Sequence, residues 1–110
     1  MPSPPSSARP PAALLDAVVA YFNPRRVILF GSHARGDAGR DSDYDLLVVT
    51  DDDAPAEKLT LRAGYEARRA FRRPADVVPC RESTFRRRAG MPGTLCYVAA
   101  REGVVVYERR

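Results

Sequence analysis

The chain has 110 residues, a formal net charge of +4 and 45% hydrophobic residues. This length fits one domain with a modest core and leaves no room for a second, substrate-binding domain. No apolar run approaches the roughly 18 residues that cross a bilayer, and the first residues lack the layout of a secretory signal. We therefore expect a soluble, cytoplasmic protein that has no membrane partner.

The N-terminal segment 1–11 contains five prolines and three serines and almost no other apolar residue. This composition predicts a disordered tail. Apolar residues at helical spacing then predict a helix over Ala12–Phe22, which ends before Pro24 because the residue preceding proline disfavours helical geometry. We divide the chain into the tail 1–11 and a folded domain, 12–110.

Two predicted strands surround a polar loop. Arg26–Phe30 is a β-branched and aromatic run that stops at Gly31-Ser32, and Tyr44–Thr50 is a second apolar run. Consecutive strands usually lie side by side, so we expect the Gly31-Ser32 turn to lie next to Asp43 and Asp45.

Asp43 and Asp45 are predicted to point to the same face, because side chains alternate along a strand. Two like charges about 4 Å apart repel by roughly 4 kcal/mol at an effective dielectric constant of about 20, so the pair needs a compensating partner. Magnesium suits them, since it is held by one or two carboxylates together with substrate phosphates. The alternative is that Asp43 caps a turn and Asp45 is a solvated strand end.

The spacing between the Gly31-Ser32 turn and the two aspartates is a further informative feature of this loop. Gly31-Ser32 is separated by ten residues from Asp43-Tyr44-Asp45, and Arg35-Gly36 and Ser42 complete the pattern. The pattern resembles the signature of the minimal nucleotidyltransferases of the DNA polymerase β-like superfamily. The resemblance covers roughly residues 12–109. It implies an α/β (α+β) fold in which a small mixed sheet is flanked by helices.

The resemblance also implies roles for the loop residues. Gly31 and Ser32 would hold the nucleotide phosphates, with glycine allowing close backbone approach and the hydroxyl adding a donor, and Ser42 would join the nucleotide-binding residues. For Arg35 two roles stay open, contact with the phosphates or pairing with a nearby aspartate. His33 lies in a polar loop, and we expect it to be solvated.

A helix is predicted over residues 56–71, after the acidic run 51–53. We expect the run to be a solvated strand exit that also places favourable charge at the start of this helix. Gly64 is expected to weaken the helix slightly. The residues predicted to form its apolar face are Leu59, Ala63, Ala67 and Ala70.

Residues 76–80 predict a third strand. A strand, helix and strand in one sheet are usually parallel, so Asp76 is expected at the same edge as Asp43 and Asp45. The resemblance likewise places a third catalytic carboxylate on this strand. The alternative for Asp76 is a simple turn residue between helix and strand.

The C-terminal part predicts a short basic helix over Glu82–Arg88, a helix over 94–102 that Gly103 ends, and a last strand over 104–107. In the second helix we expect Leu95, Val98 and Ala99 to point inward. Nine arginines fall between positions 62 and 88. They can attract nucleotide phosphates, nucleic acid or an acidic protein, or simply form a solvated helix face.

These features together predict a metal-dependent nucleotidyltransferase. Asp43, Asp45 and Asp76 would hold two Mg²⁺ ions, and ATP would donate AMP to a hydroxyl group. The resemblance implies a protein acceptor, since many minimal nucleotidyltransferases are antitoxins of HEPN-domain ribonuclease toxins. Two alternatives stay open: a non-catalytic binding antitoxin, and nucleotide transfer to RNA.

Overall fold

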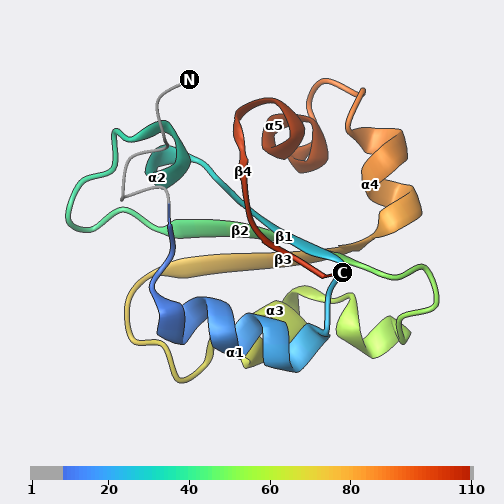
Figure 1. Cartoon of the computed structure of the whole chain (residues 1–110), viewed down its shortest axis with the longest axis horizontal. Coiled ribbons are helices and arrows are strands. Elements are labelled where there is room, and N and C mark those ends of the chain that lie inside the picture. Colours follow the sequence, from blue (N-terminus) through green and yellow to red (C-terminus); the bar gives the residue numbers. More distant parts are fainter. Residues whose placement is uncertain (1–8, 110) are drawn as a thin grey trace.

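The computed structural model describes residues 9–109 and contains one four-stranded sheet between two layers of helices (Figure 1). Helices α1 and α3 lie on one face, and α4 and α5 lie on the other. Most of the predicted tail 1–11 falls outside the described residues. The strands are β1 (Arg26–Phe30), β2 (Tyr44–Thr50), β3 (Ala75–Arg81) and β4 (Val104–Glu108). The helices are α1 (Ala12–Phe22), α2 (Ser32–Arg35), the 3₁₀ turn η2 (Ala56–Lys58), α3 (Leu61–Arg68), α4 (Glu82–Arg88) and α5 (Leu95–Glu102).

The sheet is mixed, as expected, with the order β3-β2-β1-β4. Strand β1 is antiparallel to both β2 and β4, whereas β2 and β3 are parallel. The α3 crossover between β2 and β3 accounts for the parallel pair. The start of β2, the start of β3 and the end of β1 therefore meet at one end of the sheet.

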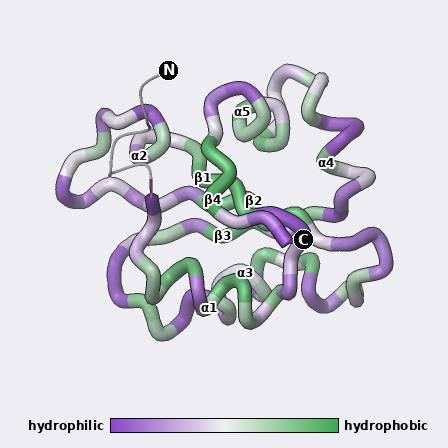
Figure 2. The backbone as a smooth tube through the Cα atoms, in the orientation of Figure 1, coloured by the Kyte–Doolittle hydropathy of each residue, from purple (hydrophilic) through white to green (hydrophobic). Residues whose placement is uncertain are grey.

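Strands β1 and β2 form the centre of the molecule, and each contributes apolar side chains to both faces. Figure 2 shows the hydrophobic segments gathered on these strands and on the inner sides of α1 and α3. Even-numbered β2 residues face the α1 and α3 layer, and odd-numbered ones face α4 and α5. This alternation follows from the period of a strand, and it places Tyr44 and Asp45 on opposite faces.

The helix predicted over 56–71 is in fact divided in two. Residues Ala56–Lys58 form the 3₁₀ turn η2, and α3 begins after Thr60, whose hydroxyl accepts a hydrogen bond from the Ala63 backbone N–H at 3.0 Å. Threonine is a favoured N-cap, and it starts a new helix here. The predicted apolar face was partly wrong, since Ala63 and Ala67 are buried but Ala70 is exposed.

Gly64 is the point where α3 packs directly on the backbone of β3. A Cβ atom at this position would lie 1.9 Å from the Val77 carbonyl oxygen. The glycine that the sequence identified as a weak point of the helix is therefore the residue that permits the helix to approach the sheet.

Gly64→Ala is expected to lower the melting temperature, although alanine is favoured over glycine in a helix by about 1 kcal/mol. The added methyl group must push α3 away from Val77, and the lost packing outweighs the gain in propensity. Thermal denaturation measures the effect. Gly90→Ala is a matched control, because no atom of residues 9–109 lies within 4 Å of a Cβ atom there. A Gly64→Ala protein as stable as the Gly90→Ala protein would contradict this account.

In helix α5 (Leu95–Glu102) the prediction is confirmed for Val98 and Ala99 and wrong for Leu95. Leu95 is 47% exposed, whereas Cys96 and Ala99 are buried against β1 and β2. Both cysteines, Cys80 and Cys96, are free thiols. Burial and the neighbouring Cys96 thiol raise the pKa of Cys80 to about 12, which disfavours its reactive thiolate form.

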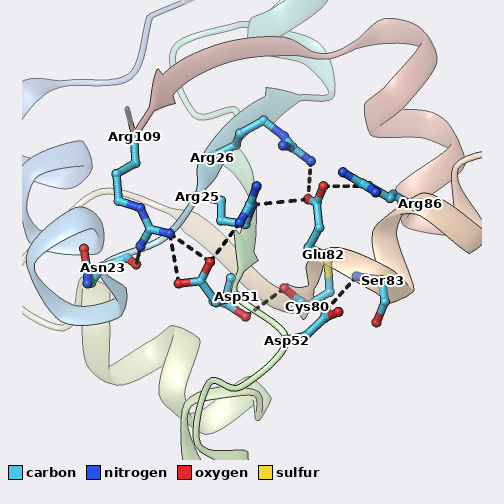
Figure 3. A network of polar contacts seen from close by, with 11 residues as sticks. Asn23, Arg25, Arg26, Asp51, Asp52, Cys80, Glu82, Ser83, Arg86 and Arg109 are labelled. Atoms are coloured by element: carbon cyan, nitrogen blue, oxygen red, sulfur yellow. Dashed lines mark hydrogen bonds and ion pairs between the residues drawn. The ribbon is translucent and has the colours of Figure 1, made fainter.

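Asp51 and Asp52, the first two residues of the acidic run, belong to a polar network at the end of the sheet where β2 finishes (Figure 3). Asp51 accepts hydrogen bonds from Arg109 at 2.8 Å and from Arg25 at 3.1 Å. Asp52 accepts from the Ser83 backbone N–H at 2.8 Å, at the first turn of α4. The favourable charge was thus predicted for the wrong helix, because Asp52 supports α4, which lies beside it in space.

The longest helix among residues 9–109 is α1, with 11 residues. A helix that crosses a bilayer needs about 20 apolar residues. Within the described part of the chain, no helix has the length and apolar character for a membrane span.

Candidate active site

Three strand ends bring the predicted site residues together. In the sheet register, Phe30 is opposite Asp45, and Asp45 is opposite Asp76. Gly31 directly follows Phe30, so the Gly31-Ser32 turn lies against the start of β2. Asp45 and Asp76 share the face covered by α4 and α5. The expected juxtaposition of the turn with Asp45 is present in the structure, and Asp43 directly precedes β2.

The Gly31 backbone packs against the Asp45 carboxylate. Gly31 has φ 78° and ψ −156°, a conformation that is essentially limited to glycine. A Cβ atom here would lie 2.3 Å from Asp45 Oδ2. Glycine is therefore required twice, for the backbone conformation and for the space beside the carboxylate. The turn leads into α2, whose first backbone N–H groups have no partner within the helix.

The three carboxylates form one region of negative charge. Burial raises the pKa of Asp45, and the nearby carboxylates of Asp76 and Asp43 raise it further. The side chains of Asp43 and Asp76 are exposed, whereas Asp45 is half-buried. The charge on Asp45 is therefore disfavoured until a cation or a proton compensates for it.

The carboxylates share one edge of the sheet without forming a closed cage. Within residues 9–109, no three His, Cys, Asp or Glu side chains converge closely enough to hold a metal ion by themselves. An open arrangement of carboxylate oxygens still fits Mg²⁺, which keeps several waters and takes further ligands from substrate phosphates. The raised pKa of Asp45 and the exposure of Asp43 and Asp76 agree with this donor set.

The two remaining predicted nucleotide-binding residues make contacts within the protein. Arg35 Nε donates to Asp37 at 3.1 Å, and its Nη1 lies 3.5 Å from a Glu102 carboxylate oxygen. The Ser42 hydroxyl accepts a hydrogen bond from the Gly39 backbone N–H at 2.9 Å. Of the two roles left open for Arg35, pairing with an aspartate is the one that the structure shows.

His33 is not solvated, contrary to expectation. Its side chain is 6% exposed, and its ring stacks on that of Tyr44 with centroids 3.8 Å apart. The prediction failed because the residues around His33 are polar, and local polarity alone indicates exposure to solvent. Helix α2 folds back over Tyr44, and this contact depends on tertiary structure.

A cavity of about 310 Å³ opens beside two of the carboxylates. Asp45 and Asp76 line it together with apolar side chains from both helical layers. Three of these are strongly exposed large hydrophobic residues, namely Leu61 (75%), Tyr65 (56%) and Leu95 (47%). The sequence gives no sign of this group, because the residues come from α3 and α5 and meet only when the helices cover opposite faces of β3.

Several arginines between positions 62 and 88 support the fold. Arg68 donates to the carbonyl oxygens of Phe71 and Arg73, and Arg81 donates to the carbonyl oxygen of Asp52. Arg86 pairs with Glu82 at 2.8 Å within α4. These hydrogen bonds and ion pairs within the protein explain several of the arginines in the basic region, and they require no nucleic acid.

Comparison with known proteins agrees with this geometry. No curated protein matches the sequence significantly. Two solved structures share the fold, at identities too low to indicate more. One is a candidate nucleotidyltransferase from Sulfolobus solfataricus, with TM-score 0.56 and 22% identity over 87% of this chain and 75% of that chain. The other is a toxin-antitoxin with AMP-PNP, with TM-score 0.62 and 18% identity over 92% of this chain and 76% of that chain.

The family model of the nucleotidyltransferase domain matches residues 12–95. This range is most of the chain, and it includes the Gly31-Ser32 turn and the carboxylates of Asp43, Asp45 and Asp76. The chain therefore belongs to the nucleotidyltransferase domain family.

Proposed function

We propose that this protein transfers AMP from ATP to a hydroxyl group of a partner protein, and that it acts as the antitoxin of a HEPN-domain ribonuclease toxin. The observation that carries the proposal is the contact between the Gly31 backbone and the Asp45 carboxylate, with Asp76 next to Asp45 in the sheet. A phosphate-binding turn and a cation-binding pair of carboxylates are the two parts that nucleotidyl transfer requires.

In this proposal, each site residue has a defined task. Asp43 and Asp45 hold Mg²⁺ with the triphosphate, and Gly31 and Ser32 bind the phosphates. Bound Mg²⁺ supplies neutralisation of phosphate charge and a lower pKa for the attacking hydroxyl group. Asp76 contributes to the metal site and takes up the proton that the attacking hydroxyl group releases. The acceptor oxygen forms a bond to the α-phosphorus as the bond to pyrophosphate breaks.

The cavity supports a protein as the acceptor. Its apolar wall, which includes Leu61, Tyr65 and Leu95, suits a side chain and its surrounding segment better than a polar sugar. Asp76 lies in the same wall, where an acceptor hydroxyl would need its base. The toxin-antitoxin with AMP-PNP that shares this fold supports a toxin as the partner and an adenine nucleotide as the donor.

The proposal predicts a covalent product. Incubation with magnesium, α-labelled ATP and the protein encoded next to it is expected to add mass to that partner in units of AMP. Intact-mass measurement of both chains identifies the acceptor. Asp43→Asn is expected to abolish the added mass, because it removes a carboxylate of the site. A mass increase that persists undiminished in Asp43→Asn would exclude this assignment.

The same exposed side chains favour a second candidate function, a non-catalytic binding antitoxin. Leu61, Tyr65 and Leu95 form a patch that a partner can cover without any transfer. The two functions differ in their need for nucleotide. Stable binding of the partner with no mass increase from any of the four nucleotides would favour the binding antitoxin. A rise in melting temperature with magnesium and ATP would favour the enzyme, since a ligand of the folded state stabilises it.

A further inference from the structure

A stacked pair of rings connects the two sequence segments that form the site. The rings of His33 and Tyr44 are nearly parallel, with centroids 3.8 Å apart and an interplanar angle of 13°. Both side chains are buried. His33 comes two residues after Gly31, and Tyr44 lies between Asp43 and Asp45 in the chain. The stack therefore joins the phosphate side of the site to its carboxylate side.

A hydrogen bond forms a second connection between the same segments. His33 Nε2 lies 3.1 Å from the carbonyl oxygen of Ser42, the residue before Asp43. Because a carbonyl oxygen only accepts, Nε2 donates this bond and carries the ring proton. Nδ1 is buried and has no partner among residues 9–109. Burial of this nitrogen is unfavourable, so the protein keeps the ring inside at a cost that a hydrocarbon side chain would avoid.

Tyr44 provides a firm base for the stack. The Phe71 ring meets it edge-on with centroids 6.2 Å apart. The Arg73 guanidinium lies 5.2 Å from its ring centroid and donates to its hydroxyl group at 3.3 Å. The Tyr44 backbone N–H also donates to the Pro74 carbonyl oxygen at 3.1 Å. The position of His33 is thereby tied to the segment that leads into β3 and Asp76.

We propose that His33 is a positioning residue of the nucleotide site. Through its stack on Tyr44 and its bond to the Ser42 carbonyl oxygen, it holds the loop 37–43 in place and sets the distance between the Gly31-Ser32 turn and the Asp43 carboxylate. His33 stacks on Tyr44, which lies on the face of the sheet opposite to Asp45, so it acts through these two segments and does not contact the substrate. This inference rests on the proposed function.

Hydrogen exchange tests the connection without any ligand. In His33→Ala, the backbone amides of 37–43 are expected to exchange at least about 10-fold faster, while those of β1 and β2 stay protected. Val18→Ala is the matched control, because it removes volume from the core cluster that contains Tyr44, at a residue of α1. It is expected to lower the melting temperature without a selective effect on 37–43. If His33→Ala leaves the exchange of 37–43 unchanged, the proposal is wrong.

Nucleotide affinity tests the consequence for the site. With magnesium and ATP, His33→Ala is expected to bind about 10-fold more weakly than the wild type at a temperature where both are folded, since small misplacements of a site are costly. His33→Gln is expected to recover part of the affinity, because its amide N–H can replace Nε2. Val18→Ala is expected to keep wild-type affinity. Equal affinity of His33→Ala and the wild type would overturn the proposal.

The two experiments separate this proposal from the proposed function. If the wild type binds no nucleotide with magnesium, the proposed function fails. The exchange of 37–43 then still decides whether His33 holds the loop.

Discussion

Asp45→Asn is expected to abolish nucleotidyl transfer and, at neutral pH, to raise the melting temperature. Burial and the carboxylates of Asp76 and Asp43 raise the pKa of Asp45, which means that its charged form is disfavoured in the folded protein. Asparagine keeps the size of the side chain and removes the charge. Transfer is expected to fall by about 100-fold or more, because a preorganised charge of the site is lost. Thermal denaturation and a transfer assay on the same preparation measure both effects.

The pH dependence of this gain follows from the direction of the pKa shift. The ordinary pKa of the group is 3.8, and the folded value lies above it. Below the ordinary value, Asp45 is protonated in both states and does not destabilise the fold. As pH rises through the folded pKa, Asp45 becomes charged in the folded protein, and this unfavourable charge lowers the free energy of unfolding. The higher melting temperature of Asp45→Asn is therefore expected near pH 7, and it should fade as pH falls towards about 4.

Asp51→Asn is the matched control, since it is the same substitution in the opposite environment. Hydrogen bonds from Arg109 and then Arg25 lower the pKa of Asp51. Its charged form stabilises the fold above the ordinary pKa, and this contribution is lost as pH falls through the folded value. Asp51→Asn is expected to lower the melting temperature at neutral pH and to keep transfer activity. If both variants shift the melting temperature in the same direction, the electrostatic explanation for Asp45 is wrong.

Gly31→Ala is expected to be strongly destabilising and to remove transfer activity. The φ of 78° and ψ of −156° cost a residue with a Cβ atom about 1–3 kcal/mol. The new methyl group would also lie 2.3 Å from Asp45 Oδ2, so the carboxylate must leave its position. Chemical denaturation gives the loss of stability, and the transfer assay gives the effect of the displaced carboxylate.

Two controls separate the backbone term from the contact with Asp45. Gly93→Ala also places alanine at positive φ, at 93°, but within the described part of the chain no atom lies within 4 Å of its Cβ atom. It is expected to show the backbone cost alone. In an Asp45→Ala background, Gly31→Ala is expected to cost less than in the wild type, because the clashing oxygen is gone. Identical costs in the two backgrounds would show that the turn and Asp45 are not coupled.

Much of the fold could be predicted because its signals are local. The apolar runs Arg26–Phe30 and Tyr44–Thr50 are strands with the predicted bounds, and Ala12–Phe22 is the predicted helix. Strand alternation and the parallel crossover were enough to place Asp45 and Asp76 side by side. The prediction of one helix over 56–71 was wrong, because the Thr60 hydroxyl caps α3 and divides the expected helix.

The residues that were misplaced depend on contacts between distant segments. His33 was expected in solvent, but it is buried because α2 brings it onto Tyr44. Leu95 was expected inside, yet α5 turns Cys96 towards the sheet. Gly64 looked unfavourable in a helix until its contact with Val77 was known. In each case, the local pattern is compatible with two environments, and packing selects one of them.

The sequence by itself determined the strand order along the chain, the spacing of Gly31-Ser32 from Asp43 and Asp45, and the family to which that spacing points. These properties depend on residue type and on distance along the chain. Only the tertiary structure decided how close Gly31 lies to Asp45, that His33 stacks on Tyr44, and that α3 and α5 form an apolar wall beside Asp76. The physical reason is that these contacts join segments whose relative position is set by helix packing on the two faces of the sheet, which no short stretch of sequence encodes.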